Sequence, residues 1–438
     1  MGSYIPSTVE ERQEMMERLG INDITELYQS VPKSMLLSRL DIPEGKSELE
    51  VKTAIEQIAR KNKVFKSIFR GAGAYNHYIP AIVKSVTSKE EFLTAYTPYQ
   101  AEISQGVLQS IFEYQTGICE ITGMDVSNAS VYDGASAAAE SVAMCTDRKR
   151  KKAIISATVN PRTVETVKTY CFASNTEIIV APQRDGKTDL GALAELVDDE
   201  TACVIIASPN YLGLIEDADE IASVVHERGA KLVMSVNPIS LGLLKSPREY
   251  GADVAVGEGQ PLGLPLSFGG PYLGFMAATG EMMRKLPGRI VGETVDVDGK
   301  RAFVLTLQAR EQHIRREKAS SNICSNEALC AMTASVYLAA MGEKGLREAA
   351  SLSFNKAHYL KDELLKIKGF SLLYNGEFFN EFVTKTPINS AELSKTLIKY
   401  DILSGLPLEE DTMLWCATEM NSKSQIDELV AAIKEVCA

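Results

Sequence analysis

The chain has 438 residues, of which 45% are hydrophobic and 24% charged, proportions that are ordinary for globular proteins and exclude disordered, collagen-like and fibrous classes. Its net charge of −12 argues against nucleic acid and an anionic membrane as partners, because either would need a basic face. No apolar run approaches the ~18 residues that span a bilayer, and the eight cysteines form no Cys-x-x-Cys pair. We therefore expect a cytoplasmic protein of enzyme size, with reduced thiols and no metal site.

Helices are predicted in the first part of the chain, which we expect to form a helical N-terminal arm over residues 1–95. Ser7–Glu10 and Ser47–Glu50 both fit the capping box, with Ser at the cap and Glu three residues later. Gly20 is expected to end the first helix. Residues 21–23 are expected to lead into a second helix. A further helix over 48–61 places its apolar residues largely along one side, so this arm must pack on something larger.

Short apolar runs alternate with stretches of helix length in the middle of the chain. The runs are nearly continuous in apolar residues, which indicates burial on both faces, as in a parallel sheet covered by helices. They lie at 153–157, 177–181, 203–207 and 231–236, with amphipathic stretches at 163–170, 190–197 and 218–228. This alternation predicts an α/β fold with a mostly parallel, doubly wound sheet, as a large domain over 96–340.

The pattern changes after about residue 345. A long helix is predicted at 345–367 and a last helix at 424–435, with short strands at 381–383 and 414–418 between them. Helices and strands in this order predict a smaller C-terminal α+β domain over 341–438.

Small residues open a predicted helix at Asp133–Glu140. They would let a phosphate approach the free backbone N–H groups at the positive end of the helix. The same residues would equally allow close packing of the helix, and the spacing does not decide between the two interpretations.

The glycine-rich stretch Gly257–Gly263 follows the strand predicted at Asp253–Val256, and Phe268–Pro271 comes shortly after it. A loop at the carboxyl end of a parallel strand is where such folds place ligands. A plain turn explains the glycines equally well.

Arg310–Lys318 carries five side chains that can be cationic and is followed by the small polar run Ala319–Cys324. Such a cluster could bind an anion. The ordinary interpretation is a solvated charged helix with internal ion pairs.

Several long and unusual strings carry a resemblance to a known family. They are Tyr4–Pro6, Gly71–Pro80, Tyr96–Gln100 with Glu102–Gly106, and Arg310–Lys318 with Ser321–Cys324. With them the chain resembles, over nearly its whole length, the alpha subunit of the two-subunit P-protein of the glycine cleavage system, glycine dehydrogenase (decarboxylating). The resemblance implies the aspartate-aminotransferase-like fold of pyridoxal-phosphate (PLP) enzymes, fold type I, in agreement with the predicted sheet and smaller C-terminal domain.

The resemblance also implies a reaction and partners. Glycine joins PLP, the cofactor takes up the electrons as CO₂ leaves, and the aminomethyl group passes to the lipoyl arm of the H-protein. The implied assembly is a cytoplasmic heterotetramer of two alpha and two beta subunits that serves glycine catabolism as an oxidoreductase. Its partners are the beta subunit, lipoylated H-protein and glycine.

One departure from the family pattern sets the role expected for this chain. The catalytic partner holds PLP through a lysine that follows a histidine after the strand corresponding to Asp253–Val256. Pro261, preceded by Gln260, stands at that position here, and proline has no amine with which to form an imine. The strand end Val236–Pro238 also lacks the aspartate that would face the pyridine nitrogen. We therefore expect no PLP and no catalytic residue in this chain, with PLP held by the partner subunit.

The resemblance then suggests two groups of site residues. Those expected to contribute to the partner's site are Arg310, His313, Arg316, Lys318, Ser321 and Asn322. Those expected at a degenerate pocket are Tyr75, Asn76, His77, Gly134 and Gln260, and Tyr75–Ile79 could instead line a route for the lipoyl arm. Two alternatives stay open. One is a free-standing PLP decarboxylase or aminotransferase that uses another lysine, and the other is a purely structural assembly partner.

Overall fold

The structure is a computed structural model that describes residues 7–37, 40–93 and 96–437. Tyr4–Pro6, part of the resemblance, therefore lies outside the described residues. The chain divides into two compact units, residues 1–64 and 65–438. A search of the described helices finds none long and apolar enough to cross a membrane. The predicted three-part division at 95/96 and 340/341 stays a prediction.

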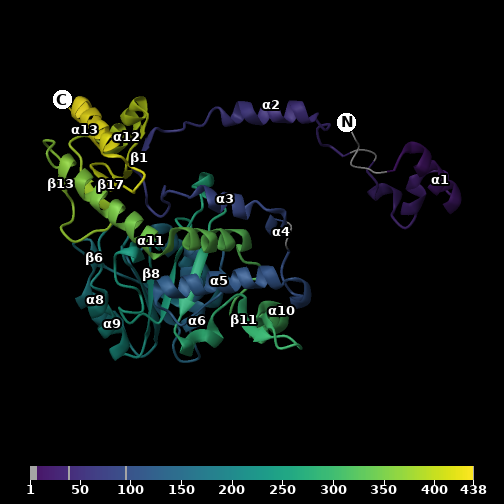
Figure 1. Cartoon of the computed structure of the whole chain (residues 1–438), viewed down its shortest axis with the longest axis horizontal. Coiled ribbons are helices and arrows are strands. Elements are labelled where there is room, and N and C mark those ends of the chain that lie inside the picture. The colour runs from purple at the N-terminus through teal and green to yellow at the C-terminus, as the bar shows by residue number, and fades with distance from the viewer. Residues whose placement is uncertain (1–6, 38–39, 94–95, 438) are drawn as a thin grey trace. The chain divides into compact units, whose positions relative to one another are not determined.

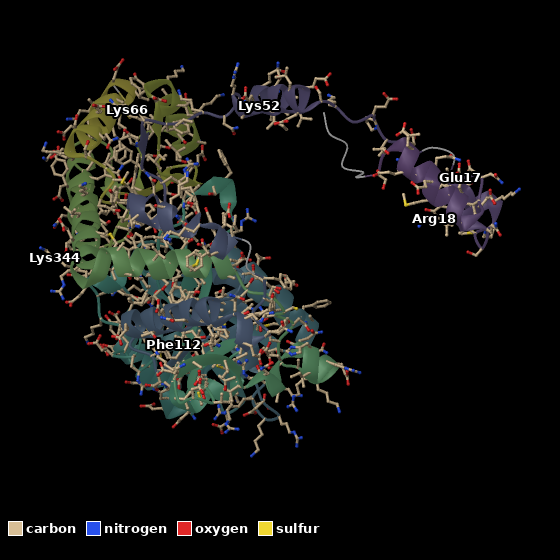
Figure 2. The ribbon with its side chains drawn as sticks, turned by 45° about the vertical axis from the view of Figure 1, so that its right-hand side comes forward. Glu17, Arg18, Lys52, Lys66, Phe112 and Lys344 are labelled. Carbon is tan, nitrogen blue, oxygen red and sulfur yellow. The ribbon has the colours of Figure 1, made fainter. Side chains whose placement is uncertain are left out.

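The first unit contains two capped helices. In α1 (Val9–Leu19) the Thr8 hydroxyl accepts from the backbone N–H of Glu11 at 3.1 Å, and the Glu11 carboxylate accepts from the N–H of Thr8 at 2.7 Å. The predicted Ser7–Glu10 box is therefore wrong by one residue, because Ser7-Thr8 and Glu10-Glu11 offer two overlapping frames with the same spacing. Gly20 ends α1 with φ of 68°, as predicted. Figure 2 labels Glu17 and Arg18 on this helix.

The second helix of this unit, α2 (Glu48–Ala59), is capped as predicted. The Ser47 hydroxyl accepts from the N–H of Glu50, and the Glu50 carboxylate accepts from the N–H of Ser47 at 2.8 Å. Its apolar side chains, Leu49 and Ile55 among them, are exposed within the described residues. Short 3₁₀ turns at Ile24–Tyr28 and Lys33–Met35 lie between the helices.

The second unit is built on a seven-stranded sheet in the order β2-β10-β9-β8-β7-β3-β4. Five neighbouring strands, β9, β8, β7, β3 and β4, run parallel to one another. Strand β10 runs antiparallel to both of its neighbours. The strands are β2 (Val126–Ser127), β3 (Lys152–Ser156), β4 (Glu177–Ala181), β7 (Thr201–Ala207), β8 (Lys231–Ser235), β9 (Val254–Glu258) and β10 (Gly274–Ala278). The predicted parallel α/β sheet is confirmed.

Alternate residues of the strands enter two different cores. In β3, Ile154 packs in one core while Ala153 and Ile155 pack in the other, so the sheet is buried on both faces. The helices that cover it are α5 (Gln105–Thr122), α6 (Gly134–Cys145), α7 (Pro161–Ser174), α8 (Leu190–Leu196), α9 (Ala218–Glu227) and α11 (Ala328–Leu364). Burial on both faces explains the continuous apolar runs of the sequence.

Helix α11 is longer than predicted and changes direction at Gly342, which has φ of 60°. Its first part lies beside α5, whose Phe112 is labelled in Figure 2, and Figure 1 shows its second part leading to the C-terminal elements. Lys344 marks the turn between the two parts (Figure 2). The helix therefore belongs to both the large core and the C-terminal core.

The C-terminal elements form a four-stranded antiparallel sheet in the order β13-β14-β17-β16. Its elements are β13 (Ser371–Leu372), β14 (Glu381–Lys385), β16 (Leu406–Glu409) and β17 (Thr412–Cys416), with helices α12 (Ser390–Leu397) and α13 (Lys423–Cys437). A chain segment from far upstream joins this part, because β1 (Ser67–Ile68) pairs in parallel with β15 (Ile402–Leu403). The strands and last helix predicted here are found.

Smaller elements complete the unit. The hairpin of β11 (Ile290–Val295) and β12 (Arg301–Thr306) packs on α5, where the rings of Phe112 and Phe303 lie 5.3 Å apart. The other short elements are α3 (Ala81–Thr87), α4 (Glu90–Leu93), β5 (Gln183–Arg184), β6 (Lys187–Thr188) and α10 (Gln312–Arg315).

Candidate functional site

A cavity of about 380 Å³ lies at the carboxyl ends of the parallel strands. The last residues of three strands line it, Ala207 of β7, Ser235 of β8 and Glu258 of β9. Loop residues 71–75 and Glu381, which belongs to β14 of the C-terminal sheet, also line the cavity. This is the place where open parallel sheets bind their ligands.

An acid of the chain occupies the N-terminus of α6 inside this cavity. The Glu258 carboxylate accepts hydrogen bonds from the backbone N–H groups of Gly134 at 3.0 Å, Gln260 at 3.0 Å and Leu273 at 2.9 Å. Burial raises the pKa of Glu258 to about 7, although these three donors favour its ionised form. A carboxyl oxygen of Glu258 therefore already accepts from the first backbone N–H of α6, the group that would otherwise face a bound anion.

The small residues of α6 serve packing. A Cβ added to Gly134 would lie 2.7 Å from the backbone nitrogen of Glu258, and Ala137–Ala139 are buried in the core of this sheet face. The glycines after β9 act similarly, since a Cβ on Gly257 would meet the Phe275 ring at 2.4 Å. For α6, close packing is therefore the one of the two open interpretations that the contacts support.

A second buried acid fixes the loop over the cavity. The Glu381 carboxylate accepts from the N–H of Ala72 and from the Tyr75 hydroxyl, each at 2.7 Å. Burial raises the pKa of Glu381 to about 7. A Cβ on Gly213, which has φ of 91°, would lie 1.9 Å from the Glu381 carbonyl oxygen, so only glycine fits beside this strand.

Of the five predicted pocket residues, three lie at the cavity, and the other two, Asn76 and His77, contact the C-terminal elements instead. Tyr75 and Gly134 line the cavity, and Gln260 lies buried behind it, where its side chain bonds the Tyr75 N–H at 2.8 Å and the Tyr75 carbonyl at 3.0 Å. The Asn76 carbonyl instead accepts from the Thr418 hydroxyl. His77 is buried against Glu419, with 2.7 Å between Nδ1 and Oε2.

The position expected for a cofactor lysine is part of the packed core. Pro261 is buried directly after Gln260. Among the described residues no lysine lines the cavity, and its single arginine there is Arg162, at the start of α7. Asn237 lines the cavity at the end of β8. The described lining of the cavity therefore offers three carboxyl groups, those of Asp133, Glu258 and the buried Glu381, and no amine.

The basic segment, Arg310–Lys318, is not one charged helix. Only Gln312–Arg315 is α-helical, between 3₁₀ turns at Gln308–Arg310 and Arg316–Lys318. Arg310 donates through Nη1 to the Leu286 carbonyl, while its buried Nε and Nη2 have no partner among the described residues. The prediction of one helix over this segment is wrong, because the chain changes direction at Arg316, where φ is 54°.

Most of the candidate residues in this segment face solvent. The exposed ones are His313, Arg316, Lys318 and Asn322. In the described part of the chain the segment has one ion pair, His313 with Glu311 at 3.7 Å, so Arg316 and Lys318 have no acidic partner. The half-buried Ser321 hydroxyl bonds the carboxylate of Glu140 on α6. The arrangement presents free cations that can meet an anion from outside.

Comparison with known proteins identifies the family. The model of the glycine cleavage system P-protein family matches residues 2–433. The chain belongs to this family. It is 48% identical over 444 residues to a probable glycine dehydrogenase (decarboxylating) subunit 1 of Desulfitobacterium hafniense, covering 99% of this chain and 100% of that protein. The protein of the same description from Moorella thermoacetica is 49% identical over 444 residues, with both chains covered completely.

Solved structures agree with this assignment. A crystal structure of glycine decarboxylase (P-protein) of the glycine cleavage system, in inhibitor-bound form, superimposes with a TM-score of 0.94 at 41% identity, covering 99% of this chain and 100% of the other. Glutamate decarboxylase of Lactobacillus brevis, at 14% identity and a TM-score of 0.67 over 92% and 96% of the two chains, shows the shared fold. The predicted family and fold type I architecture are confirmed.

Proposed function

We propose that this chain is the non-catalytic alpha subunit of a two-subunit glycine-decarboxylating enzyme, in which the second subunit holds PLP. The name "subunit 1" of the similar proteins implies a second subunit. The observation that carries the proposal is the cavity at the strand ends, which has no lysine among its described lining residues. Without an amine the chain cannot bind an aldehyde cofactor covalently at this place.

Two further features of the cavity do not fit PLP. The helix end that would hold a phosphate already binds the carboxylate of Glu258. Asn237, at the end of β8, is neutral and cannot supply a carboxylate for a pyridine nitrogen. A phosphate at this helix end would have to displace the Glu258 carboxyl group from the Gly134 N–H. We therefore assign to this chain no chemical step that passes through PLP.

The basic segment gives the chain a role at its partner. Arg316 and Lys318 are exposed and have no acidic partner within the described residues, and His313 of the same segment is exposed as well. We propose that the six predicted residues between Arg310 and Asn322 border the second subunit's active site, where anionic groups of cofactor and substrate gather. Transfer of the aminomethyl group to lipoylated H-protein, a heterotetramer of two alpha and two beta subunits and a cytoplasmic location belong to the same proposal.

The test is to assay glycine decarboxylation by this chain, by its second subunit and by the pair. Activity in the pair alone is expected. The chain alone, incubated with PLP, should show no imine absorption band and no lysine labelled by borohydride reduction. A labelled lysine would contradict the proposal and support a free-standing PLP enzyme. As a control, the second subunit with its PLP lysine changed to alanine should assemble and remain inactive in the pair.

A further inference from the structure

A buried arginine without a counter-charge lies outside the cavity described above. Arg289, just before β11, is 3% exposed. Its Nη1 donates to the Asn326 side-chain oxygen at 3.1 Å and its Nη2 to the Tyr99 hydroxyl at 3.2 Å, while Nε has no partner. Both partners are neutral, and no carboxylate among the described residues pairs with this guanidinium. A buried cation left in this state is costly, so a site of this kind calls for an anion.

The start of α11 adds positive potential at the same place. No side chain caps this end of the helix, so its first backbone N–H groups are open to a ligand. Ala328 and Leu329, in the first turn, line a cavity of about 310 Å³ together with Arg289. A helix N-terminus and a buried guanidinium thus converge on one cavity, and each favours a negative group there.

The surroundings of this cavity are apolar and open. Ile111 and Met332 form part of its wall. Of its lining residues Tyr96 is 85% exposed and Leu93 53%, and Ile103, seven residues after Tyr96 in the chain, is 80% exposed. A small ligand inside the cavity would leave these side chains in water. Exposed apolar groups around a polar centre are instead typical of a surface that another protein covers.

We propose that this cavity, the Arg289 pocket, receives an aspartate or glutamate side chain of the second subunit, carried on an apolar segment that covers Leu93, Tyr96 and Ile103. The inference rests on the proposed function, because it needs a second subunit. The pocket adjoins the basic segment, since the Tyr99 ring that holds Arg289 lies 6.1 Å from that of His313. One continuous surface would then contact the partner.

The test compares Arg289→Gln with Arg347→Gln, an exposed arginine beyond the turn of α11. The dissociation constant of the pair is measured with the otherwise complete chain and second subunit. Loss of a buried charge pair costs at least about 2 kcal/mol, so Arg289→Gln should weaken association about 30-fold or more. Arg347→Gln should leave it unchanged. Wild-type association by Arg289→Gln would overturn the inference.

A second pair of variants tests the inference even if Arg289→Gln does not fold. Tyr96→Ser removes an exposed ring at the pocket rim, and Phe172→Ser removes an equally exposed ring on α7. Only Tyr96→Ser should weaken association, with both chains melting as the wild type does. A rise in the melting temperature of the isolated chain with butyrate, lost in Arg289→Gln, would identify a small-molecule site and overturn the inference. Failure of the wild-type chains to associate would overturn the proposed function as well.

Discussion

The Glu258 carboxylate accepts a hydrogen bond from the backbone N–H of Gly134 at 3.0 Å, so an acid of the same chain occupies the positive end of α6. The two residues also touch through their backbones, because a Cβ on Gly134 would lie 2.7 Å from the Glu258 nitrogen. Helix and strand are thus joined at the place where related folds admit a ligand. This contact makes Gly134 a packing residue.

Changing Gly134 to alanine should therefore destabilise the chain by about 1–3 kcal/mol, because the new methyl group meets a backbone that cannot move freely. The matched control is Gly106→Ala, in the first turn of α5, where a Cβ meets nothing within 4 Å. That change should stabilise by about 0.5–1 kcal/mol, because alanine is the better helix former. Urea unfolding of both variants measures the difference. Equal effects would show that the contact with Glu258 does not matter.

Much of the fold could be predicted from local pattern. The strands of the parallel sheet lie within two residues of the apolar runs, because burial on both faces leaves a clear signal. The first part of α11, residues 328–341, was not predicted. Its side chains are apolar or small on several sides, since it packs against α5 and α3 at once, and such a stretch lacks the periodicity of a half-exposed helix.

Local pattern pointed to the site where its residues follow a strand in sequence, whereas Tyr75 was expected through the family resemblance alone. Gln260 and Pro261 come directly after β9, and Glu258 was within the same glycine-rich stretch, where an acid at a strand end was an available signal. Glu381 had none. Its partner Tyr75 lies 306 residues away in the chain, and only the packing of the C-terminal sheet brings the two together.

Glu140 on α6 should make stability depend on pH. Its side chain is 3% exposed within the core, and burial raises its pKa from 4.5 to about 7 despite the bond to Ser321. The folded state therefore holds this proton more tightly than the unfolded state, and the stabilisation present below pH 4.5 is lost as the pH rises through about 7. Glu140→Gln should raise the free energy of unfolding by about 1–3 kcal/mol at pH 8 and change little at pH 4.5. Exposed Glu343, changed to Gln, should show no such pH dependence; a constant offset in Glu140→Gln would contradict the assignment.

Arg316 distinguishes a functional from a purely structural role of the basic segment. Its side chain is exposed and has no acidic partner among the described residues, so Arg316→Ala should leave the fold of the chain and its assembly with the second subunit intact. Exchange of the glycine carboxyl group with bicarbonate by the pair should fall about tenfold, as expected when one charge–anion contact worth about 1.4 kcal/mol is lost. Arg347→Ala provides the control. Wild-type exchange by the Arg316→Ala pair would favour a role in assembly alone. A loss of exchange that is explained by weaker association of the two subunits would favour the same role.

Glu419 is expected to hold the Asn76–Tyr78 segment on the C-terminal elements through charge. Its carboxylate lies 2.7 Å from His77 Nδ1 and accepts from the Tyr78 N–H at 2.7 Å. Burial opposes ionisation, but the contact with His77 and the hydrogen bond from the Tyr78 N–H outweigh it and hold the pKa of Glu419 below 4.5. The resulting stability is present above pH 4.5 and lost as the pH falls through the folded-state pKa. Glu419→Gln should therefore cost about 3 kcal/mol at pH 7, because it leaves His77 buried without its partner, and the gap to the wild type should narrow in acid. Urea unfolding between pH 7 and pH 4, with exposed Glu410→Gln as the reference, measures both effects, and a gap that stays constant in acid would show that the charge of Glu419 does not hold this segment.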